Sequence, residues 1–552
     1  MVKEQPDPKN ETSAHEQWLQ NLRNATREKA AELTKQDDTD VEGKVSGVWQ
    51  QAVLPSLVFI AALLPRLYFL FFVSGVENAG PDWYGDVYHH WQIAYLSWTV
   101  GFHNGFLRLW DLKGMEYFWG LLHPLILSAL FTITGSIDLL VPRLLSAASG
   151  AGIVWLLFLI IRRYFGTGTA ILAAAWAAFF PVMVYSDGLG MQDQLALFIL
   201  LGGIYFWPAK PALSGLLWGV AGMGRSEFWI YGLGLLIAAG LIDRKGERII
   251  LALVTWGFIS LLYMKYLLDK TGNPIYPVWW NYLGNAAGRW EVEKPLTADA
   301  ILAQWVFRGL FLMGVVGALL TFFKKPRGYL LYLLGSGVLI FNGIFFGFSA
   351  YIYGWLNRYY VDRLLDLSYI YLGFLLSVFF VYYLGQKVRL WGKLKLGALM
   401  VLILLAFAQV IFWPVIMGYF TAAQQGWPPQ QALAADVAKF YDGGRILIPE
   451  DRAPFTYALV RFNGINGENI VGEMFDPYFY MEGDPYVHWN LNRVKVLSWL
   501  KNEDIRLMAF PAQSDRYRKL VAKEPQYFTL KENGEILDVY AVNMSSYNSP
   551  RI

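Results

Sequence analysis

Residues 153–161 read Ile-Val-Trp-Leu-Leu-Phe-Leu-Ile-Ile, and Arg162-Arg163 follow them directly. They close an apolar run over 138–161, and an α-helix needs about 20 such residues to cross the hydrocarbon core of a membrane. Similar runs recur along the chain and predict an α-helical, multi-pass integral membrane protein with about 11 transmembrane helices. The predicted spans lie near 52–74, 138–161, 168–186, 191–207, 212–224, 227–242, 249–268, 302–323, 329–348, 364–384 and 396–418.

The composition of the 552-residue chain agrees with a membrane protein, since 55% of the residues are hydrophobic and 16% are charged. Soluble domains carry roughly 25% charged residues, so a purely soluble protein is excluded. The 46 Lys and Arg against 43 Asp and Glu leave a net charge of +3. This small, dispersed charge is not typical of a protein that binds nucleic acid. The chain has no Cys, which excludes disulfides and thiolate chemistry.

Lys and Arg concentrate in one alternating set of loops, which the positive-inside rule places in the cytoplasm. An odd number of spans then puts loop 75–137 and everything after about residue 420 outside. The apolar segment 121–134 must not cross if this rule holds, so we predict an interfacial or re-entrant helix there. The cations behind this prediction are Arg162, Arg163, Lys210, Arg244, Lys245, Arg248, Lys324, Lys325, Arg327, Lys387, Arg389, Lys393 and Lys395.

The chain is predicted to have three parts. Residues 1–46 form a charged cytoplasmic segment without the apolar core of a signal peptide. Residues 47–420 form the transmembrane domain, and residues 421–552 form a soluble extracytoplasmic α/β domain. The α/β prediction rests on helical patterns at 431–440, 494–501 and 515–523, apolar runs at 446–448 and 505–510, and a hairpin of 527–530 with 536–542 around Asn533-Gly534.

The first outer loop is the most polar part of the transmembrane domain, and it holds four of the six His residues. Its candidate site residues are Asp82, Asp86, His89 and His90. Asp86 begins a helical pattern that runs to about residue 100, where an acid can cap the helix or act in catalysis. Both interpretations of Asp86 remain open at this point.

Two further acids, Asp187 and Asp193, lie in the short outer turn between the predicted spans 168–186 and 191–207. A carboxylate that enters an apolar span is costly and marks a candidate functional site. The two outer loops therefore bring acids to the same membrane face. There a carboxylate can deprotonate a hydroxyl, or a pair can hold a divalent cation such as Mg²⁺ or Mn²⁺. The residues leave both alternatives open, and no other cofactor is indicated.

Arginines at membrane depth complement these acids. Arg225 lies between two spans next to Glu227, and Arg358 lies at the outer end of the tenth span. The guanidinium fork binds phosphate through parallel hydrogen bonds, whereas the alternative is an intramembrane ion pair or contact with lipid head groups. Arg66, within the first span, fits either role.

Motifs of several other chemistries are missing from the sequence. It has no glycine-rich phosphate loop ending in Lys-Ser or Lys-Thr, no His-Glu-x-x-His pair and no Gly-x-Ser-x-Gly elbow. These absences argue against nucleotide hydrolysis, zinc proteolysis and α/β-hydrolase chemistry.

In the order of these elements the chain resembles the GT-C superfamily of membrane glycosyltransferases, which use polyprenyl-phosphate-linked sugars. The superfamily includes protein mannosyltransferases, lipid A sugar transferases and oligosaccharyltransferases, and the resemblance covers roughly residues 55–420. The segments that carry it are Asp82 to Trp91, His123-Pro124, Pro142 to Ser146, Ile161 to Gly166, Phe180-Pro181, Asp193, Gly222 to Arg225, Thr271 to Pro277 and Arg358-Tyr359.

The resemblance implies inversion at the anomeric carbon of a sugar that leaves its lipid phosphate. Asp86 would be the base that deprotonates an acceptor hydroxyl. Asp193 or Asp187 would position the acceptor or a metal, and Arg225 and Arg358 would neutralise the lipid phosphate. The implied partners are a polyprenyl-phosphate-sugar donor, an extracytoplasmic glycan, lipid or protein acceptor, and membrane lipids.

The chain also departs from the subfamilies. Its outer domain lacks the Trp-Trp-Asp-Tyr-Gly motif of oligosaccharyltransferases, and Asp86 is followed by Val87 rather than by the Glu of protein mannosyltransferases. Metal-dependent members carry an acid-x-acid arrangement in the second outer loop, where Met191-Gln192-Asp193 supplies one acid. The resemblance therefore does not by itself imply a metal.

Alternative functions are a lipid or sugar transporter or flippase, an oligosaccharyltransferase-like enzyme, and a non-enzymatic anchor for the outer domain. A transporter is typically built from repeats with polar residues spread through the midplane. This chain shows no internal repeat and concentrates its acids near the outer face. A sugar transfer, by a hexosyl- or pentosyltransferase, is therefore the leading hypothesis.

Overall fold

The structure is a computed structural model that describes most of the chain between residues 52 and 548. The predicted spans near 329–348 and 364–384, nearly all of 302–323, and the site residues Asp82 and Arg358 lie outside the described residues. The described ranges are 52–78, 86–101, 119–243, 246–279, 396–448, 453–471, 493–512 and 515–548. Residue 20 and the residue pairs 298–299, 301–302 and 305–306 are also described.

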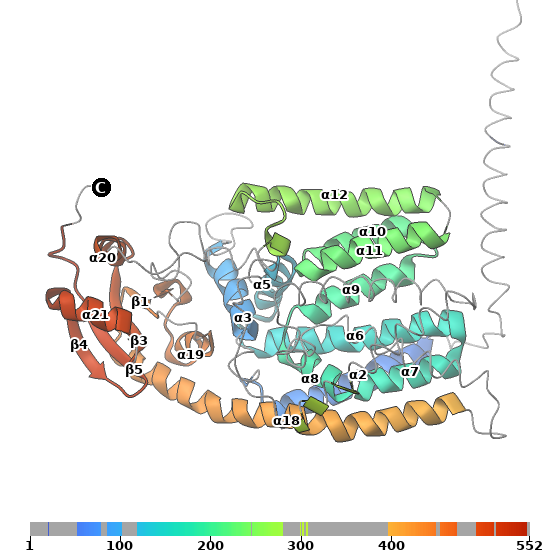
Figure 1. Cartoon of the computed structure of the whole chain (residues 1–552), viewed down its shortest axis with the longest axis horizontal. Coiled ribbons are helices and arrows are strands. Elements are labelled where there is room, and N and C mark those ends of the chain that lie inside the picture. The colour runs from blue at the N-terminus through green and yellow to red at the C-terminus, as the bar shows by residue number, and fades with distance from the viewer. Residues whose placement is uncertain are drawn as a thin grey trace, which may run out of the picture.

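A bundle of roughly aligned helices makes up the larger part of the molecule, and two short helices lie between it and a smaller C-terminal unit (Figure 1). The short helices are α3 (Asp86–Leu96) and α5 (Leu122–Thr134). The bundle consists of α2 (Leu54–Tyr68) with its π-helical extension η2 (Phe69–Ser74), α6 (Leu140–Phe165), α7 (Thr167–Phe179), α8 (Pro181–Leu189), α9 (Asp193–Phe206), α10 (Pro211–Gly222), α11 (Ser226–Asp243), α12 (Gly246–Thr271) and α18 (Leu396–Ala438).

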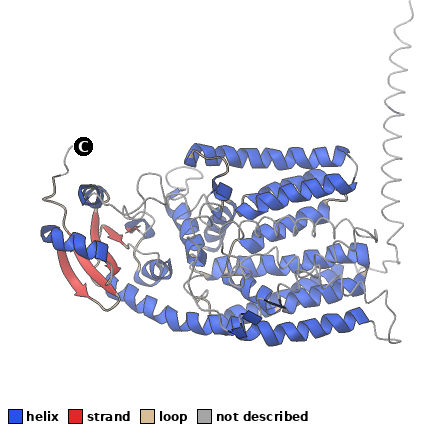
Figure 2. Cartoon of the chain, in the orientation of Figure 1, coloured by secondary structure: helices blue, strands red, loops and turns tan. Residues whose placement is uncertain are grey.

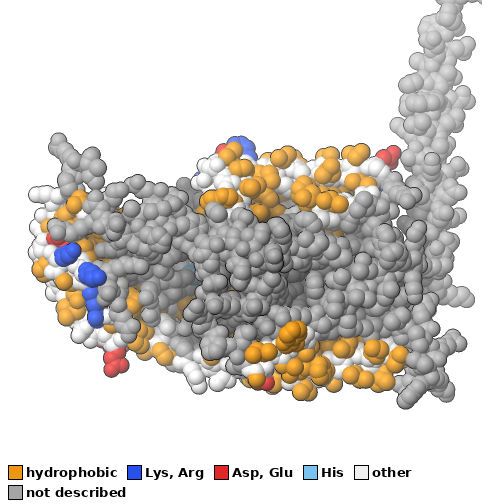
Figure 3. Space-filling model, in the orientation of Figure 1, with side chains coloured by type: hydrophobic (Ala, Val, Ile, Leu, Met, Phe, Trp, Pro, Cys, Tyr) orange, Lys and Arg blue, Asp and Glu red, His pale blue; other side chains and the backbone are white. Residues whose placement is uncertain are grey.

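Several helices are suited to a membrane. Four described segments are long and apolar enough to cross one, namely Leu54–Ser74, Leu140–Arg163, Gly246–Thr271 and Leu396–Ala422. Figure 3 shows hydrophobic side chains along the surfaces of α12 and α18. Phe258 and Val410 there are 61% and 73% exposed, a costly arrangement in water that a lipid environment removes. These helices mark the chain as an integral membrane protein.

The span predicted over 168–186 is bent in the structure. It consists of α7 and α8, which meet at a bend of 59°. Pro181 explains the break, because its ring removes the backbone donor and favours the first turn of a new helix. Helices α9 and α10 have 14 and 12 residues, short of the roughly 20 that a full crossing needs. The described residues thus contain four helices that are long and apolar enough to span a membrane, or five if the bent pair counts as one span, and the predicted count of about 11 is not confirmed.

Helix α18 links the bundle to the C-terminal unit. It runs without interruption for 43 residues, so the boundary predicted near residue 420 falls inside a helix. The continuous helix also includes residues 431–438 of the pattern predicted separately at 431–440.

The C-terminal unit is a five-stranded sheet with helices, as Figure 2 shows, and its predicted α/β character is confirmed. The strand order is β2-β1-β3-β5-β4; β1 pairs in parallel with β2 and β3, and β5 pairs antiparallel with β3 and β4. The strands are β1 (Arg445–Leu447), β2 (Ile470–Val471), β3 (Ile505–Pro511), β4 (Phe528–Asn533) and β5 (Leu537–Val542). The helices are α19 (Ala453–Asn463), α20 (Arg493–Asn502) and α21 (Asp515–Lys523), of which α19 was not predicted.

Cations gather at the end of α9 that lies away from Asp193. The Arg163 Nη1 donates to the Tyr205 carbonyl at 2.9 Å, and the Arg248 Nη2 donates to the Trp207 carbonyl at 2.5 Å. Both guanidinium groups also lie over the rings of these aromatic residues. The basic loops of the positive-inside argument thus lie at the opposite end of α9 from its acid.

Candidate active site

Asp193 and Arg225 form the centre of the candidate site. The Arg225 Nη1 lies 2.6 Å from the Asp193 Oδ1, and the two side chains are 21% and 4% exposed, respectively. Asp193 is the first residue of α9, where the helix dipole favours a carboxylate. The turn before it includes Gly190 at φ 102°, a backbone conformation that favours glycine. The result is a buried anion with a partly exposed cation at one end of the bundle.

The start of α5 is fixed against the turn that carries Arg225. The Leu122 N–H donates to the Met223 carbonyl at 3.1 Å. Gly120 has φ 99°, and a Cβ there would lie 2.4 Å from the same carbonyl oxygen. Only glycine fits this close approach without a backbone shift. The segment 119–123 is therefore held beside Arg225.

A cluster of Trp119 and three histidines lies next to this ion pair. The Trp119 ring centroid lies 5.5 Å from that of His89 and 4.7 Å from that of His90, and His90 lies 5.4 Å from His123. His90 and His123 are buried, and neither ring has a hydrogen-bond partner among the described residues. Burial lowers the pKa of His123 to about 3. Burial, followed by the charges of His123 and Arg225, lowers the pKa of His90 well below its usual value. Both imidazoles are therefore neutral at pH 7.

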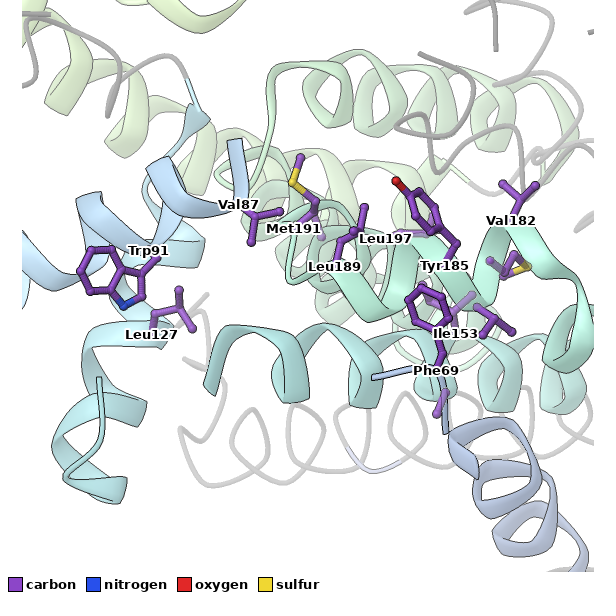
Figure 4. Packing of buried hydrophobic residues seen from close by; sticks show 14 of the residues in the cluster. Phe69, Val87, Trp91, Leu127, Ile153, Val182, Tyr185, Leu189, Met191 and Leu197 are labelled. Carbon is purple, nitrogen blue, oxygen red and sulfur yellow. The ribbon is translucent and has the colours of Figure 1, made fainter. Parts of the chain in front are cut away.

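Asp86 is the first residue of α3, so the predicted helix start is confirmed for its backbone. Its side chain lies outside the described residues. His90 follows one helical turn later and shares the same face of the helix. In Figure 4, Val87 of α3 and Met191 of the turn before Asp193 lie in one group of buried side chains. The structure thus places α3 at the same end of the bundle as Asp193 and Arg225.

Asp187 has a different environment. The Arg66 Nη2 lies 2.6 Å from the Asp187 Oδ2, and both side chains are almost fully buried. The Arg66 Nε donates to the same oxygen at 2.7 Å. A Cβ on Gly150 would lie 2.2 Å from the Asp187 carboxylate, so this close approach requires glycine. Arg66 therefore forms the intramembrane ion pair that was one of its predicted roles, and its partner is Asp187.

A metal does not fit the described residues. They contain no group of three or more His, Asp or Glu side chains that could hold an ion. Asp187 and Asp193 each pair with a different arginine. Asp82 and the side chain of Asp86 lie outside this test. The proposed reaction therefore includes no step at Mg²⁺ or Mn²⁺.

Arg143 is a buried arginine that was not among the predicted site residues. Its Nε donates to the Gly188 carbonyl at 2.8 Å, and its Nη2 donates to the Ser74 hydroxyl at 2.6 Å. It thereby ties the end of α8 to the segment that leads into the first outer loop. A cation inside the predicted span 138–161 is the signal that would have identified it.

No family model and no curated protein matches the chain. Among solved structures, it is similar to the Archaeoglobus fulgidus oligosaccharyltransferase tethered with an acceptor peptide, at 12% identity and a TM-score of 0.49 over 92% of this chain and 76% of that one. The archaeal oligosaccharyltransferase AglB from Archaeoglobus fulgidus, in complex with an inhibitory peptide and a dolichol-phosphate, aligns at 11% identity and a TM-score of 0.48 over 92% and 76%. ArnT from Cupriavidus metallidurans aligns at 13% identity and a TM-score of 0.49 over 91% and 99%.

Proposed function

We propose that the protein is an inverting glycosyltransferase that moves a hexosyl or pentosyl group from a polyprenyl-phosphate donor to a hydroxyl of an extracytoplasmic glycan, lipid or protein. The observation that carries this proposal is the Asp193–Arg225 pair at 2.6 Å, beside a helix that begins at Asp86. A base and a phosphate-binding cation at one end of an apolar bundle are the groups that such a transfer needs. The resemblance to the GT-C superfamily in the order of the sequence segments also supports it.

In the proposed reaction Asp86 takes the proton of the acceptor hydroxyl, and the hydroxyl oxygen attacks the anomeric carbon. The bond between that carbon and the phosphate oxygen breaks, and its electron pair leaves with the lipid phosphate. Attack from the face opposite the leaving group inverts the configuration. A carboxylate with an ordinary pKa is a weak base, so proton transfer is expected late in this step.

Arg225 is the proposed ligand of the leaving phosphate. One guanidinium nitrogen faces Asp193, and the 21% exposure of the side chain gives the group access to a ligand. A guanidinium carries five N–H donors in a planar fork, so it can serve a carboxylate and a phosphate together. Asp193 would hold Arg225 in place, and Arg358 is proposed as a second phosphate ligand.

His89 and the neutral ring of His90 are proposed to position the acceptor, together with Asp82. A neutral imidazole offers one N–H donor and one acceptor nitrogen, which suits a sugar hydroxyl. The burial and ion pair of Asp187 support a structural role instead, as the anion that compensates Arg66 inside the bundle.

The test is a transfer assay with purified protein in lipid nanodiscs. Polyprenyl-phosphate hexoses and pentoses are supplied with glycan, lipid and peptide acceptors, and wild type is compared with Asp86→Asn. The matched control is Asp436→Asn, which removes an exposed acid of α18 that pairs with Lys439. We expect Asp86→Asn to lose at least about 100-fold in rate, as for loss of a general base, while the control keeps its rate. An equally active Asp86→Asn variant would exclude Asp86 as the base.

A further inference from the structure

The residues that precede the acidic part of the first outer loop are held from several sides. The Arg143 Nη1 donates to the carbonyls of Gly75, Val76 and Asn78 at 2.5, 2.9 and 3.1 Å. The carbonyl of the intervening Glu77 accepts from the Tyr88 hydroxyl of α3 at 2.8 Å. The backbone of 75–78 is thereby tied to α6 and to the start of α3.

The C-terminal unit supplies one more contact, through Tyr457 of α19. The Tyr457 hydroxyl donates to the Glu77 Oε2 at 2.5 Å and accepts from the Leu139 N–H at 3.1 Å. Its ring centroid lies 4.7 Å from that of Trp91 and 5.6 Å from that of Tyr88, both on α3. The buried side chain of Tyr457 therefore contacts both Glu77 and α3.

Further contacts hold α19 against the same region. Arg461 of α19 forms an ion pair with Asp138, which precedes α6. The Trp91 Nε1 donates to the carbonyl of the neighbouring Ile137 at 2.6 Å. A Cβ on Gly467, shortly after α19, would lie 2.5 Å from the Tyr95 ring of α3. The segment from α19 to Gly467 thus packs closely against α3 at Tyr88, Trp91 and Tyr95.

We infer that Tyr457 is a positioning residue through which the C-terminal unit fixes the start of α3, and with it Asp86, against the bundle. This inference rests on the proposed function, because it assigns a catalytic consequence to the placement of Asp86. Tyr457 acts through its contacts with Glu77 and α3.

The chemistry of the contact favours a lasting hydrogen bond. Burial, followed by the hydrogen bond to Glu77, raises the pKa of Tyr457, so the phenol keeps the proton that it donates. A hydrogen bond to a carboxylate is stronger than one between neutral groups. Loss of the hydroxyl would also leave the Leu139 N–H without the acceptor shown here.

The experiment measures kcat and donor KM for Tyr457→Phe, Glu77→Leu and the double variant. We expect each to lower kcat about tenfold, the effect of one charge-assisted hydrogen bond, with donor KM changed less than twofold. The double variant should be no slower than either single variant. Glu77→Gln, which keeps an oxygen acceptor, should recover most of kcat. The control is Tyr547→Phe, since the Tyr547 hydroxyl contacts only Val494 and Ser498 within the described C-terminal unit.

A spin-label measurement tests the inference without any activity. The chain has no Cys, so a pair of introduced cysteines is labelled cleanly. Ile133 of α5 and Ile536 of the sheet unit are 79% and 46% exposed and suit this purpose. We expect a narrow distance distribution in the cysteine pair alone and with Tyr547→Phe added, and a broader one with Tyr457→Phe or Glu77→Leu.

The outcomes separate the two proposals. An unchanged distance distribution in Tyr457→Phe would overturn the positioning role, whatever the wild type catalyses. Unchanged kcat in Tyr457→Phe, or additive losses in the double variant, would also overturn it. The wild type could fail to transfer any sugar while Tyr457→Phe still broadens the distance distribution. That result would refute the proposed function and leave the positioning role of Tyr457 in place.

Discussion

Replacing Arg225 by Gln separates the two roles proposed for this residue. In the wild type, the Arg225 Nη1 faces the Asp193 Oδ1 at 2.6 Å. The variant leaves Asp193, 4% exposed, without its cation. Removing one partner of a buried ion pair costs about 3–5 kcal/mol. We expect the lower end, about 3 kcal/mol, because the arginine side of the pair is partly hydrated.

The reverse change, Asp193→Asn, leaves a cation that is 21% exposed and therefore reached by water. Its cost should be smaller, about 1–2 kcal/mol, the lower part of the range for an unsatisfied polar group, because water reaches the guanidinium. The two variants should differ more in phosphate binding. Arg225→Gln removes the proposed ligand and should weaken polyprenyl phosphate at least about tenfold, whereas Asp193→Asn removes a nearby anion and should not weaken it.

Both effects are measured on purified protein in one detergent. Thermal unfolding followed by tryptophan fluorescence should give a Tm order of wild type, Asp193→Asn and Arg225→Gln, from highest to lowest. Titration with polyprenyl phosphate gives the Kd of each protein. An Asp193→Asn variant that unfolds earlier than Arg225→Gln, or an Arg225→Gln variant that binds the lipid normally, would refute this account of the pair.

Further predictions address the fold and the topology. Asp187→Leu should destabilise the bundle by about 3–5 kcal/mol because Arg66 is left buried without its anion, and the double variant Arg66→Met/Asp187→Leu should recover much of the lost Tm. Gly120→Ala should lower stability by more than about 1 kcal/mol, since φ is 99° and the new Cβ would lie 2.4 Å from the Met223 carbonyl oxygen; a Gly246→Ala control meets no atom within 4 Å. His90 and His123 have lowered pKa values in the folded protein, so below about pH 6.5 the unfolded chain binds more protons than the folded one. The free energy of unfolding should therefore be unaffected by these two groups above that pH and should fall as the pH is lowered toward 3. A His123→Asn variant should show a smaller fall in Tm between pH 7 and pH 5, and an unchanged slope would contradict this linkage. A single cysteine introduced at Ile536 should react with a membrane-impermeant maleimide on intact cells, whereas protection until lysis would place the sheet unit on the cytoplasmic side.

Features that depend on local pattern could be predicted from the sequence. The thickness of the hydrocarbon core sets a length for apolar helices, and the run at 138–161 accordingly appears as α6. The hairpin around Asn533-Gly534 and the helix Asp515–Lys523 follow from turn chemistry and periodicity, and the structure has both. Asp193 is a candidate site residue because a carboxylate at the start of an apolar helix is costly without a partner, and Arg225 is its partner in the structure.

Contacts between distant segments could not be predicted in this way. Arg66 and Asp187 are 121 residues apart, and Glu77 and Tyr457 are 380 residues apart. Their pairing depends on how the helices pack, which periodicity does not encode. Helix α19, which covers residues 453–463 and carries Tyr457, was also not predicted from the sequence. The positioning role inferred for the C-terminal unit is therefore visible only in three dimensions.

The proposed reaction is an inverting sugar transfer from a lipid phosphate. The most direct measurement supplies a polyprenyl-phosphate sugar of known anomeric configuration, isotopically labelled at the anomeric carbon, and follows that carbon by NMR. We predict that the label leaves the lipid and appears on the acceptor with the opposite configuration, at a rate that Asp86→Asn lowers at least about 100-fold. A label that stays on the lipid with every donor and acceptor, or one that reaches the acceptor with its configuration retained, would contradict the account.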